Sequence, residues 1–297
     1  GLPDGSNTQF GDDHSRMNWR GTLAKWARVF KRDDQLFAAT EGKEGKAPAE
    51  TAFALADSGF YSMRSGWDGK AVMLVLKCGP DGGWHCQPDN GTFEIFAGGR
   101  RLTPDSGSYI YNGDEQAQKD RAWFRQTRVH QTLTLDDKDT AFAPTLVAWK
   151  PGADLDVLVV ENAGYPGLTH RRAVFFVGKK YFVVVDEALG SAAGQAAVHF
   201  RLAPASGAAV IDAGRLSART GFPGGTNLLV QGMAQDGLKL VEEEGRVSFE
   251  YGSKQSRPAF RFELKKGPAS VRFVTVRVPY QGPAPAVRAA WVGHSEP

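Results

Sequence analysis

The chain has 297 residues, and with 41% hydrophobic residues it can bury one large core or two ordinary ones. Its 36 basic and 33 acidic residues leave a net charge of +3, too small to make a nucleic acid or an anionic membrane the obvious partner. No apolar run approaches the roughly 20 residues of a membrane-spanning helix, so we expect a globular protein. The sequence begins GLPDG without signal-peptide features, which places any export signal upstream.

The first fifty residues are predicted to be helical, unlike the rest. From Asn18 to Ala38 apolar residues recur at steps of three and four, the pattern of one amphipathic helix. Its aromatic stripe needs a partner surface, so the helix either caps the next domain or ends a helical domain. The charged stretch EGKEGKAPAE (41–50) contains Pro48 and predicts a linker. We therefore expect a helical segment with its linker over 1–50 and a separate domain over 51–297.

From residue 51 onward the sequence is typical of an antiparallel β protein. Short runs rich in Val, Phe, Tyr and Thr alternate with Gly, Pro, Asn and Asp, and no helical pattern of useful length separates them. This pattern excludes βαβ folds and predicts a mainly β protein, a large antiparallel β-sandwich. Strands are expected within AVMLVLK (71–77), TFEIFA (92–97), HQTLTL (130–135), DVLVVEN (156–162), RAVFFV (172–177), YFVVVDE (181–187), RVSFEY (246–251), AFRFEL (259–264) and SVRFVTVRV (270–278).

The densest cluster of polar, aromatic and glycine residues lies between Phe60 and Leu135. Within it GGWHCQPDNGT places Trp84, His85 and Gln87 in a turn-rich link between two strands, a common setting for functional loops. In an extended segment, His85 and Gln87 would point to one face and supply two groups to one site. The alternative is a histidine that merely satisfies an ordinary turn.

Asp105, in TPDSG, and His130, in VHQT, complete a candidate cation site. A carboxylate, an imidazole and the Gln87 amide oxygen suit a divalent ion, with Zn, Mn or Ca decided by geometry and water content. The residues alone favour a structural explanation, because PDSG is ordinary turn chemistry and His130 fits a strand.

The two cysteines, Cys78 and Cys86, flank a glycine-rich segment. In an exported protein they would bridge a hairpin, and otherwise they would be two small hydrophobic side chains. The spacing leaves both alternatives open.

Three runs resemble a known family: SGFYSMRSGW (58–67), GGWHCQPDNGTFEIFAGGRRLTPDSGSYIY (82–111) and RAWFRQTRVHQTLTLDD (121–137). Over residues 58–137 the chain resembles heparinase II/III polysaccharide lyases, most closely the heparinase III branch. The resemblance implies the C-terminal portion, a β-sandwich preceded by a short helical remnant of an α/α-toroid. The opening PDGSNTQFGD (3–12) resembles the loop that follows the catalytic tyrosine of that toroid.

The resemblance implies a lyase that cleaves heparan sulfate or a related uronic-acid-containing glycosaminoglycan by β-elimination. An Asn and a Tyr of the toroid act in the family, and both lie upstream of Gly1 in its pattern, so this chain would be an incomplete enzyme. His85 matches the histidine that the sandwich contributes, a proton donor near the uronate carboxylate or bridging oxygen. The implied partners are the acidic polysaccharide and the missing toroid, in the bacterial periplasm or outside the cell.

The resemblance also places Gln87, Asp105 and His130 at the ligand positions of a structural divalent metal ion. Heparinase II has a histidine where this chain has Gln87. Because an amide oxygen is a harder ligand than an imidazole, Ca or another hard cation then suits the site better than Zn.

For the polysaccharide itself, the expected contacts are Trp84, Arg125 and Arg128. Guanidinium groups bind sulfates and carboxylates bidentately, and an indole ring stacks on a sugar. Two further hypotheses remain at this stage. One is a carbohydrate-binding sandwich without catalysis, and the other is an alginate or hyaluronan lyase of the same architecture.

Overall fold

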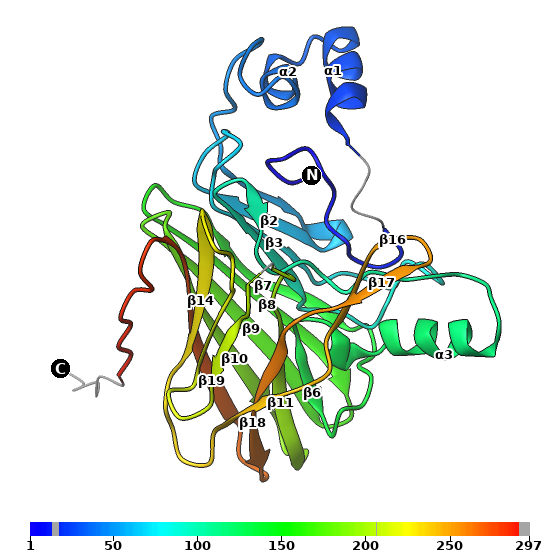
Figure 1. The fold of residues 1–297 in the computed structure, drawn as a ribbon, viewed down its shortest axis with the longest axis vertical. Helices are drawn as coiled ribbons and strands as arrows, with labels where there is room; N and C mark the ends of the chain where they lie inside the picture. The colour runs from blue at the N-terminus through cyan, green and yellow to red at the C-terminus, as the bar shows by residue number, and fades with distance from the viewer. Residues whose placement is uncertain (14–17, 206, 291–297) are drawn as a thin grey trace.

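The structure is a computed structural model, and it describes residues 1–13, 18–205 and 207–290. Antiparallel sheets form the body of the molecule, and a pair of helices lies beyond one end of it (Figure 1). Every run predicted to hold a strand contains one, and the mainly β fold is confirmed. None of the described helices is long and apolar enough to cross a membrane.

The largest sheet has eight antiparallel strands. Buried and half-buried residues alternate strictly along its central strand β9, as expected when one face of a sheet packs on a core. In spatial order its strands are β12 (Val210–Asp212), β13 (Ser217–Arg219), β14 (Thr226–Gly232), β19 (Val271–Gln281), β10 (Tyr181–Leu189), β9 (Leu168–Val177), β8 (Leu155–Tyr165) and β7 (Pro144–Lys150).

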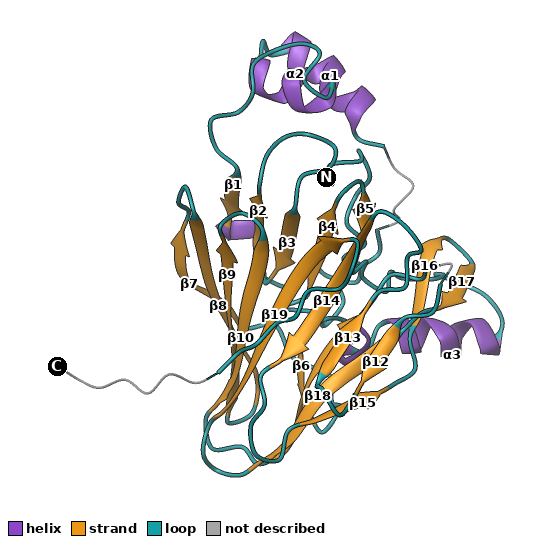
Figure 2. Ribbon diagram, turned by 60° about the vertical axis from the view of Figure 1, so that its left-hand side comes forward, coloured by secondary structure: helices purple, strands orange, loops and turns teal. Residues whose placement is uncertain are grey.

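Two smaller sheets and a hairpin accompany the large sheet (Figure 2). The five-stranded sheet contains β1 (Ala52–Leu55), β2 (Phe60–Arg64), β3 (Met73–Lys77), β4 (Phe93–Ala97) and β5 (Arg100–Arg101). The four-stranded sheet contains β15 (Lys239–Glu242), β18 (Ala259–Lys266), β11 (Gly194–Arg201) and β6 (Leu133–Leu135). The hairpin pairs β16 (Arg246–Glu250) with β17 (Ser253–Ser256).

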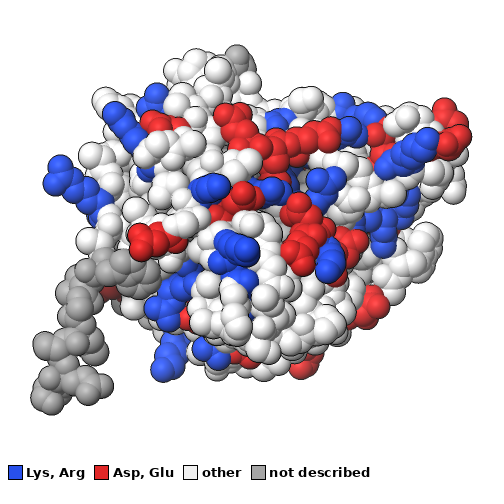
Figure 3. Space-filling model, turned by 90° about the horizontal axis from the view of Figure 1, so that it is seen from below, with Lys and Arg blue, Asp and Glu red and all other residues white. Residues whose placement is uncertain are grey.

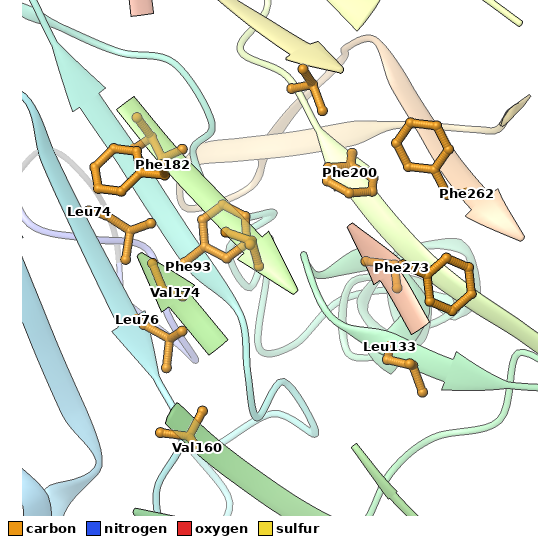
Figure 4. Close-up of a cluster of buried hydrophobic side chains, with 14 of the residues drawn as sticks. Leu74, Leu76, Phe93, Leu133, Val160, Val174, Phe182, Phe200, Phe262 and Phe273 are labelled. Atoms are coloured by element: carbon orange, nitrogen blue, oxygen red, sulfur yellow. The ribbon is translucent and has the colours of Figure 1, made fainter. Parts of the chain in front are cut away.

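One continuous apolar core joins these three sheets (Figure 4). Leu74 and Phe93 come from the five-stranded sheet, Phe182 from the eight-stranded sheet, and Phe200 and Phe262 from the four-stranded sheet. All five side chains are at most 1% exposed, which makes this core the main source of hydrophobic stabilisation. The β-sandwich prediction is thereby confirmed, and the loop between β3 and β4 begins at Cys78, which is part of this core.

The single helix expected over Asn18–Ala38 is wrong, because the structure has two shorter helices there. Helix α1 spans Arg20–Val29 and α2 spans Asp33–Ala39, and Lys31 between them has a φ of 53° that no helix can continue through. Residues 40–51 form no helix or strand, in agreement with the expected linker. The division of the chain into folding units at residue 50 stays a prediction.

Helix α3 (Glu115–Phe124) was not expected from the sequence. Its hydrophobic residues lie mainly at its C-terminal end, where Trp123 and Phe124 are buried, so it lacks the periodic stripe that reveals most helices. The side chain of Asp114 caps it by accepting a hydrogen bond from Ala117 N (2.8 Å). Helix α3 lies beside the β3–β4 loop.

Charged side chains of both signs are interspersed on the surface. On the face in Figure 3, Lys and Arg lie next to Asp and Glu and do not form one broad basic area. This mixture agrees with the small net charge of +3. It favours local recognition of an anion over general attraction to a polyanion.

Candidate active site

The loop between β3 and β4 carries His85 at its outer end. The chain turns at Trp84 and His85, whose exposed fractions are 71% for Trp84 and 55% for the His85 side chain. Two residues later, Gln87 is fully buried. A shared face for His85 and Gln87 was expected if the segment were extended, and that condition is not met because the chain turns at this point.

Asp12, from the N-terminal segment, contacts both of these residues. Its side chain is 3% exposed, and its carboxylate oxygens lie 3.3 Å from His85 Nδ1 and 3.4 Å from Gln87 Nε2. The backbone also joins the two segments, because Asp12 N donates to His85 O (3.2 Å). A Cβ on neighbouring Gly11, whose φ is +65°, would lie 2.8 Å from His85 O, so glycine permits this close approach.

Helix α3 brings two arginines to the same carboxylate. Arg121 Nη2 and Arg125 Nη1 lie 3.5 Å and 3.4 Å from its oxygens. Arg125 also donates to Cys86 O (2.7 Å), which ties the helix to the loop. Arg128 lies beyond the end of α3, where its Nε donates to Gln126 Oε1 (2.7 Å). The structure thus brings Arg125 to the His85 loop, whereas Arg128 makes its contact elsewhere.

Aromatic rings form a row beside His85. The Trp84 ring is 4.1 Å from the imidazole, and the Tyr111 ring is 6.1 Å from each of them. Tyr251, at the tip of the β16–β17 hairpin and 52% exposed, continues the row 5.8 Å from Tyr111. The Arg121 guanidinium lies 4.9 Å from the Tyr111 ring centre. Apolar ring faces beside guanidinium groups suit a sugar chain that carries anionic groups.

Asp105 and His130 form a buried pair beneath the loop. Neither is exposed, and His130 Nδ1 lies 2.9 Å from Asp105 Oδ1. Thr92 Oγ1 donates to the other carboxylate oxygen (3.0 Å). Burial opposes ionisation of Asp105, but His130 and Arg257 together lower its pKa. Because a carboxylate only accepts hydrogen bonds, Nδ1 is the nitrogen that donates to Asp105, and Nε2 is the nitrogen left to face a metal ion.

Two atoms of the expected metal-binding set have no partner. Gln87 Oε1 and His130 Nε2 are buried without a hydrogen bond, and such atoms are costly unless something satisfies them. In this respect Gln87, Asp105 and His130 fit a divalent cation. Contacts join only Asp105 to His130, whereas the Gln87 amide donates to Gly11 O (3.0 Å). Across residues 1–13, 18–205 and 207–290, no three His, Cys, Asp or Glu side chains gather around a metal position.

The base of the loop is fixed by buried polar groups. Arg172 of β9 donates to Gly91 O and to Gln131 O, which links the loop to the residue after His130. Asp186 of β10 accepts from Arg172 Nε (2.6 Å) and lies 2.7 Å from His170 Nε2. Burial opposes its ionisation, yet Arg172 and His170 hold the pKa of Asp186 well below its usual range. These buried hydrogen bonds therefore hold the inner part of the loop against β9 and β10.

Both cysteines are free thiols in the structure. Cys78 is buried, and burial raises the pKa of its thiol to about 12. Cys86 is half-buried, and its Sγ accepts a hydrogen bond from Gly82 N (3.2 Å). Of the two alternatives, the structure shows the unbridged one.

Sequence reasoning missed Asp12 and Tyr251, and it did not select Arg121 or Tyr111 as site residues. Asp12 lies within the opening run that resembles a toroid loop, which was its only signal. The contacts of Asp12 join residues 73 to 113 positions apart, so no local pattern reveals them.

Comparison with known proteins places this arrangement in context. The family model described as heparinase II/III-like, C-terminal, matches residues 47–289. A heparin-sulfate lyase of Pedobacter heparinus is 45% identical over 286 residues, which cover 95% of this chain and 43% of that protein. A heparin-sulfate lyase of Bacteroides stercoris is 36% identical over 290 residues, 96% of this chain and 43% of the relative.

Solved structures agree with the sequence comparison. The crystal structure of the heparan sulfate lyase HepC from Pedobacter heparinus superposes with a TM-score of 0.90 at 44% identity, covering 95% of this chain and 45% of that one. A crystal structure of heparinase III gives a TM-score of 0.86 at 29% identity, covering 93% of this chain and 45% of that one. The chain thus spans less than half the length of these relatives. It belongs to the heparinase II/III family, to whose C-terminal β-sandwich region it corresponds.

Proposed function

We propose that this chain supplies the β-sandwich part of a polysaccharide lyase that acts on heparan sulfate or a related uronic-acid-containing glycosaminoglycan. The observation that carries the proposal is the exposed His85 ring, which lies against the Asp12 carboxylate beside two arginines and a row of aromatic rings. The names of the relatives support the substrate class, since they are heparin-sulfate lyases.

The proposed reaction is β-elimination at a uronate. A base removes the C5 proton beside the carboxylate, and the glycosidic oxygen then leaves to give an unsaturated product. Because that proton is weakly acidic, the carboxylate charge must be neutralised and the leaving oxygen protonated. His85 serves this step through Nε2, because Nδ1 faces Asp12. A protonated ring donates from Nε2 to the carboxylate or the bridging oxygen.

The remaining reacting groups would come from a toroid domain of a longer protein. In this proposal that domain provides a Tyr and an Asn, and the active site lies between it and the His85 surface. The same proposal places the protein in the periplasm or outside the cell, where a polysaccharide substrate is met.

The substrate-binding surface consists of Trp84, Arg125 and Arg128. The indole of Trp84 is 71% exposed and offers a ring face to a sugar. Arg125 uses one guanidinium nitrogen on Cys86 O and one near Asp12, and its five donors leave others for a substrate anion. Arg128 would join the surface by exchanging its contact with Gln126 for one with a sulfate.

Gln87, Asp105 and His130 would hold a divalent metal ion, Ca, Zn or Mn, in a structural role. The two unpartnered buried atoms in this set support the assignment. When bound, the ion would supply a positive charge that holds the inner part of the loop against the strands behind it. The chain's own residues keep their places around it through Thr92 and Gly11.

The decisive experiment measures unsaturated uronate by ultraviolet absorbance during incubation with heparan sulfate. The purified chain is assayed alone and mixed with the separately produced N-terminal part of the Pedobacter heparinus relative. We expect product in the mixture, and a loss of about 1,000-fold for His85→Ala. Arg215→Ala is the matched control, because its side chain is 85% exposed and lies in the β12–β13 turn.

The other outcomes contradict the proposal in distinct ways. Binding of heparan sulfate without product from any preparation would favour a carbohydrate-binding module. Product from alginate or hyaluronan in place of heparan sulfate would change the substrate class. Product from this chain alone would mean that a base within it, and not one in a toroid, removes the proton.

A further inference from the structure

The Asp12 carboxylate lies at the centre of the His85 surface, yet neither the reaction nor the metal set uses it. Its side chain is 3% exposed, and four donors from two other segments surround it. They are His85 Nδ1 at 3.3 Å, Gln87 Nε2 at 3.4 Å, Arg125 Nη1 at 3.4 Å and Arg121 Nη2 at 3.5 Å.

All four distances exceed the usual hydrogen-bond range of about 2.7–3.2 Å. The Tyr111 hydroxyl also interacts with this carboxylate, so Asp12 is shared among several neighbours at once. The two guanidinium groups pair with this nearly buried side chain, where an unpaired carboxylate would be costly. This arrangement places the Asp12 carboxylate directly beside the His85 ring.

That carboxylate determines which nitrogen of His85 faces outward. A carboxylate only accepts hydrogen bonds, so the nitrogen beside it must carry a proton. Nδ1 lies beside Asp12 Oδ2, which leaves Nε2 on the exposed side of the ring. An orienting carboxylate of this kind fixes both the tautomer and the direction of a catalytic imidazole.

We propose that Asp12 is the positioning residue of His85: it keeps the proton on Nδ1 and directs Nε2 towards the substrate. The proposal rests on the lyase function proposed above. A purely structural role for the carboxylate is the alternative. Other hydrogen bonds already join the segments without the carboxylate. Asp12 N donates to His85 O (3.2 Å), and the Gln87 side-chain amide donates to Gly11 O (3.0 Å).

The first test observes the imidazole directly. The chain is labelled with ¹⁵N-histidine and studied by long-range ¹H–¹⁵N NMR at a pH where imidazole is neutral, with the His85 signals identified from His85→Gln. We expect the Nδ1–H tautomer in the native chain. Asp12→Asn should give a mixture of tautomers, because an amide offers Nδ1 either an acceptor or a donor. Asp156→Asn is the matched control, a buried carboxylate paired with Lys179 (2.6 Å) near the start of β8.

The second test uses the active preparation from the mixing experiment. Asp12→Asn should lower kcat about 100-fold with KM changed less than about twofold. In a His85→Ala background the same substitution should have no further effect, because Asp12 acts through that ring. Losses that multiply would instead indicate a general structural role and overturn the proposal.

The two proposals fail separately. An Nε2–H tautomer in the native chain, or an unchanged tautomer in Asp12→Asn, overturns the role of Asp12 whatever the lyase assay shows. Absence of product from every preparation refutes the lyase function, while the NMR comparison still decides what Asp12 does to His85.

Discussion

The outer and inner parts of the β3–β4 loop differ in exposure and in the length of their polar contacts. At the outer end, Trp84 and His85 are exposed, and the contacts of the His85 side chain are long. At the inner end, Asp89 and Asn90 are at most 1% exposed, and Lys77 Nζ lies 2.6 Å from Asp89. The same short segment therefore has an outer part that is open to solvent and an inner part that is buried. Along this loop, the residues exposed to solvent are different from the residues that hold the loop in place.

This difference predicts different consequences for substitutions. At the outer end water replaces a lost contact, so a change affects chemistry while the fold persists. At the inner end a lost partner leaves a buried polar group unsatisfied, so the fold itself weakens. The following experiments test that separation.

The largest effect on the fold is expected at Asp186, below the inner end. Asp186→Ala leaves Arg172 and His170 buried without their carboxylate, and should lower the free energy of unfolding by about 3–5 kcal/mol. Glu187→Ala is the matched control, since the neighbouring carboxylate pairs with exposed Arg272 and should matter by about 1 kcal/mol or less. Urea unfolding measures both, and equal losses would show that the base is no more sensitive than the surface.

The next largest effect, a loss of stability, is expected when a metal ion is removed from the inner part of the loop. If an ion is held at about a hundred times its dissociation constant, a chelator should reduce stability by about 2.7 kcal/mol, and calorimetry should show a lower Tm. Mass spectrometry should detect one divalent ion in the native chain and none in His130→Gln. His199→Gln should retain it, because that equally buried histidine pairs with Glu243 (2.9 Å) elsewhere. The metal assignment would be contradicted if the native chain contained no metal and its Tm changed with neither chelator nor added cations.

Low pH should reduce the stability of the fold through protonation of His170, below the inner part of the loop. Burial lowers its pKa although Asp186 opposes the shift, so the unfolded chain, with a histidine pKa of about 6.5, takes up the proton more readily. The stability contribution is complete above about pH 6.5 and declines as the pH falls towards the lower folded pKa, by at most about 1.4 kcal/mol per unit. His170→Gln should flatten this slope in urea unfolding. Parallel slopes for the two proteins would refute this explanation.

The smallest effect is expected at the outer end. Tyr251→Ala removes a 52% exposed ring from the row that leads to His85, and should raise KM for heparan sulfate about fivefold, or about 1 kcal/mol, with kcat unchanged. The Tm should stay within about 2 °C. Tyr181→Ala, at the start of β10 in the large sheet, is the matched aromatic control. A fall in kcat, or an equal change in the control, would show that Tyr251 does not contact the substrate.

The sequence predicted the sheets well and the helices poorly. Strand runs such as 172–177 were recognisable because alternation and β-branched residues are local signals. Helix α3 was missed because its buried side chains, Trp123 and Phe124, gather at one end, and the break at Lys31 depends on backbone conformation that periodicity does not report.

The same division applies to the candidate site. The residues of the loop were found from their density and their resemblance to a family, and Asp105 and His130 do lie together. The sequence by itself determined the β architecture, the family and the loop that carries His85. Only the tertiary structure decided that His85 is exposed while Gln87 is buried, and that Asp12 and α3 meet at that loop. Those contacts join segments far apart in the chain, and such pairings depend on how the sheets pack, which no local pattern encodes.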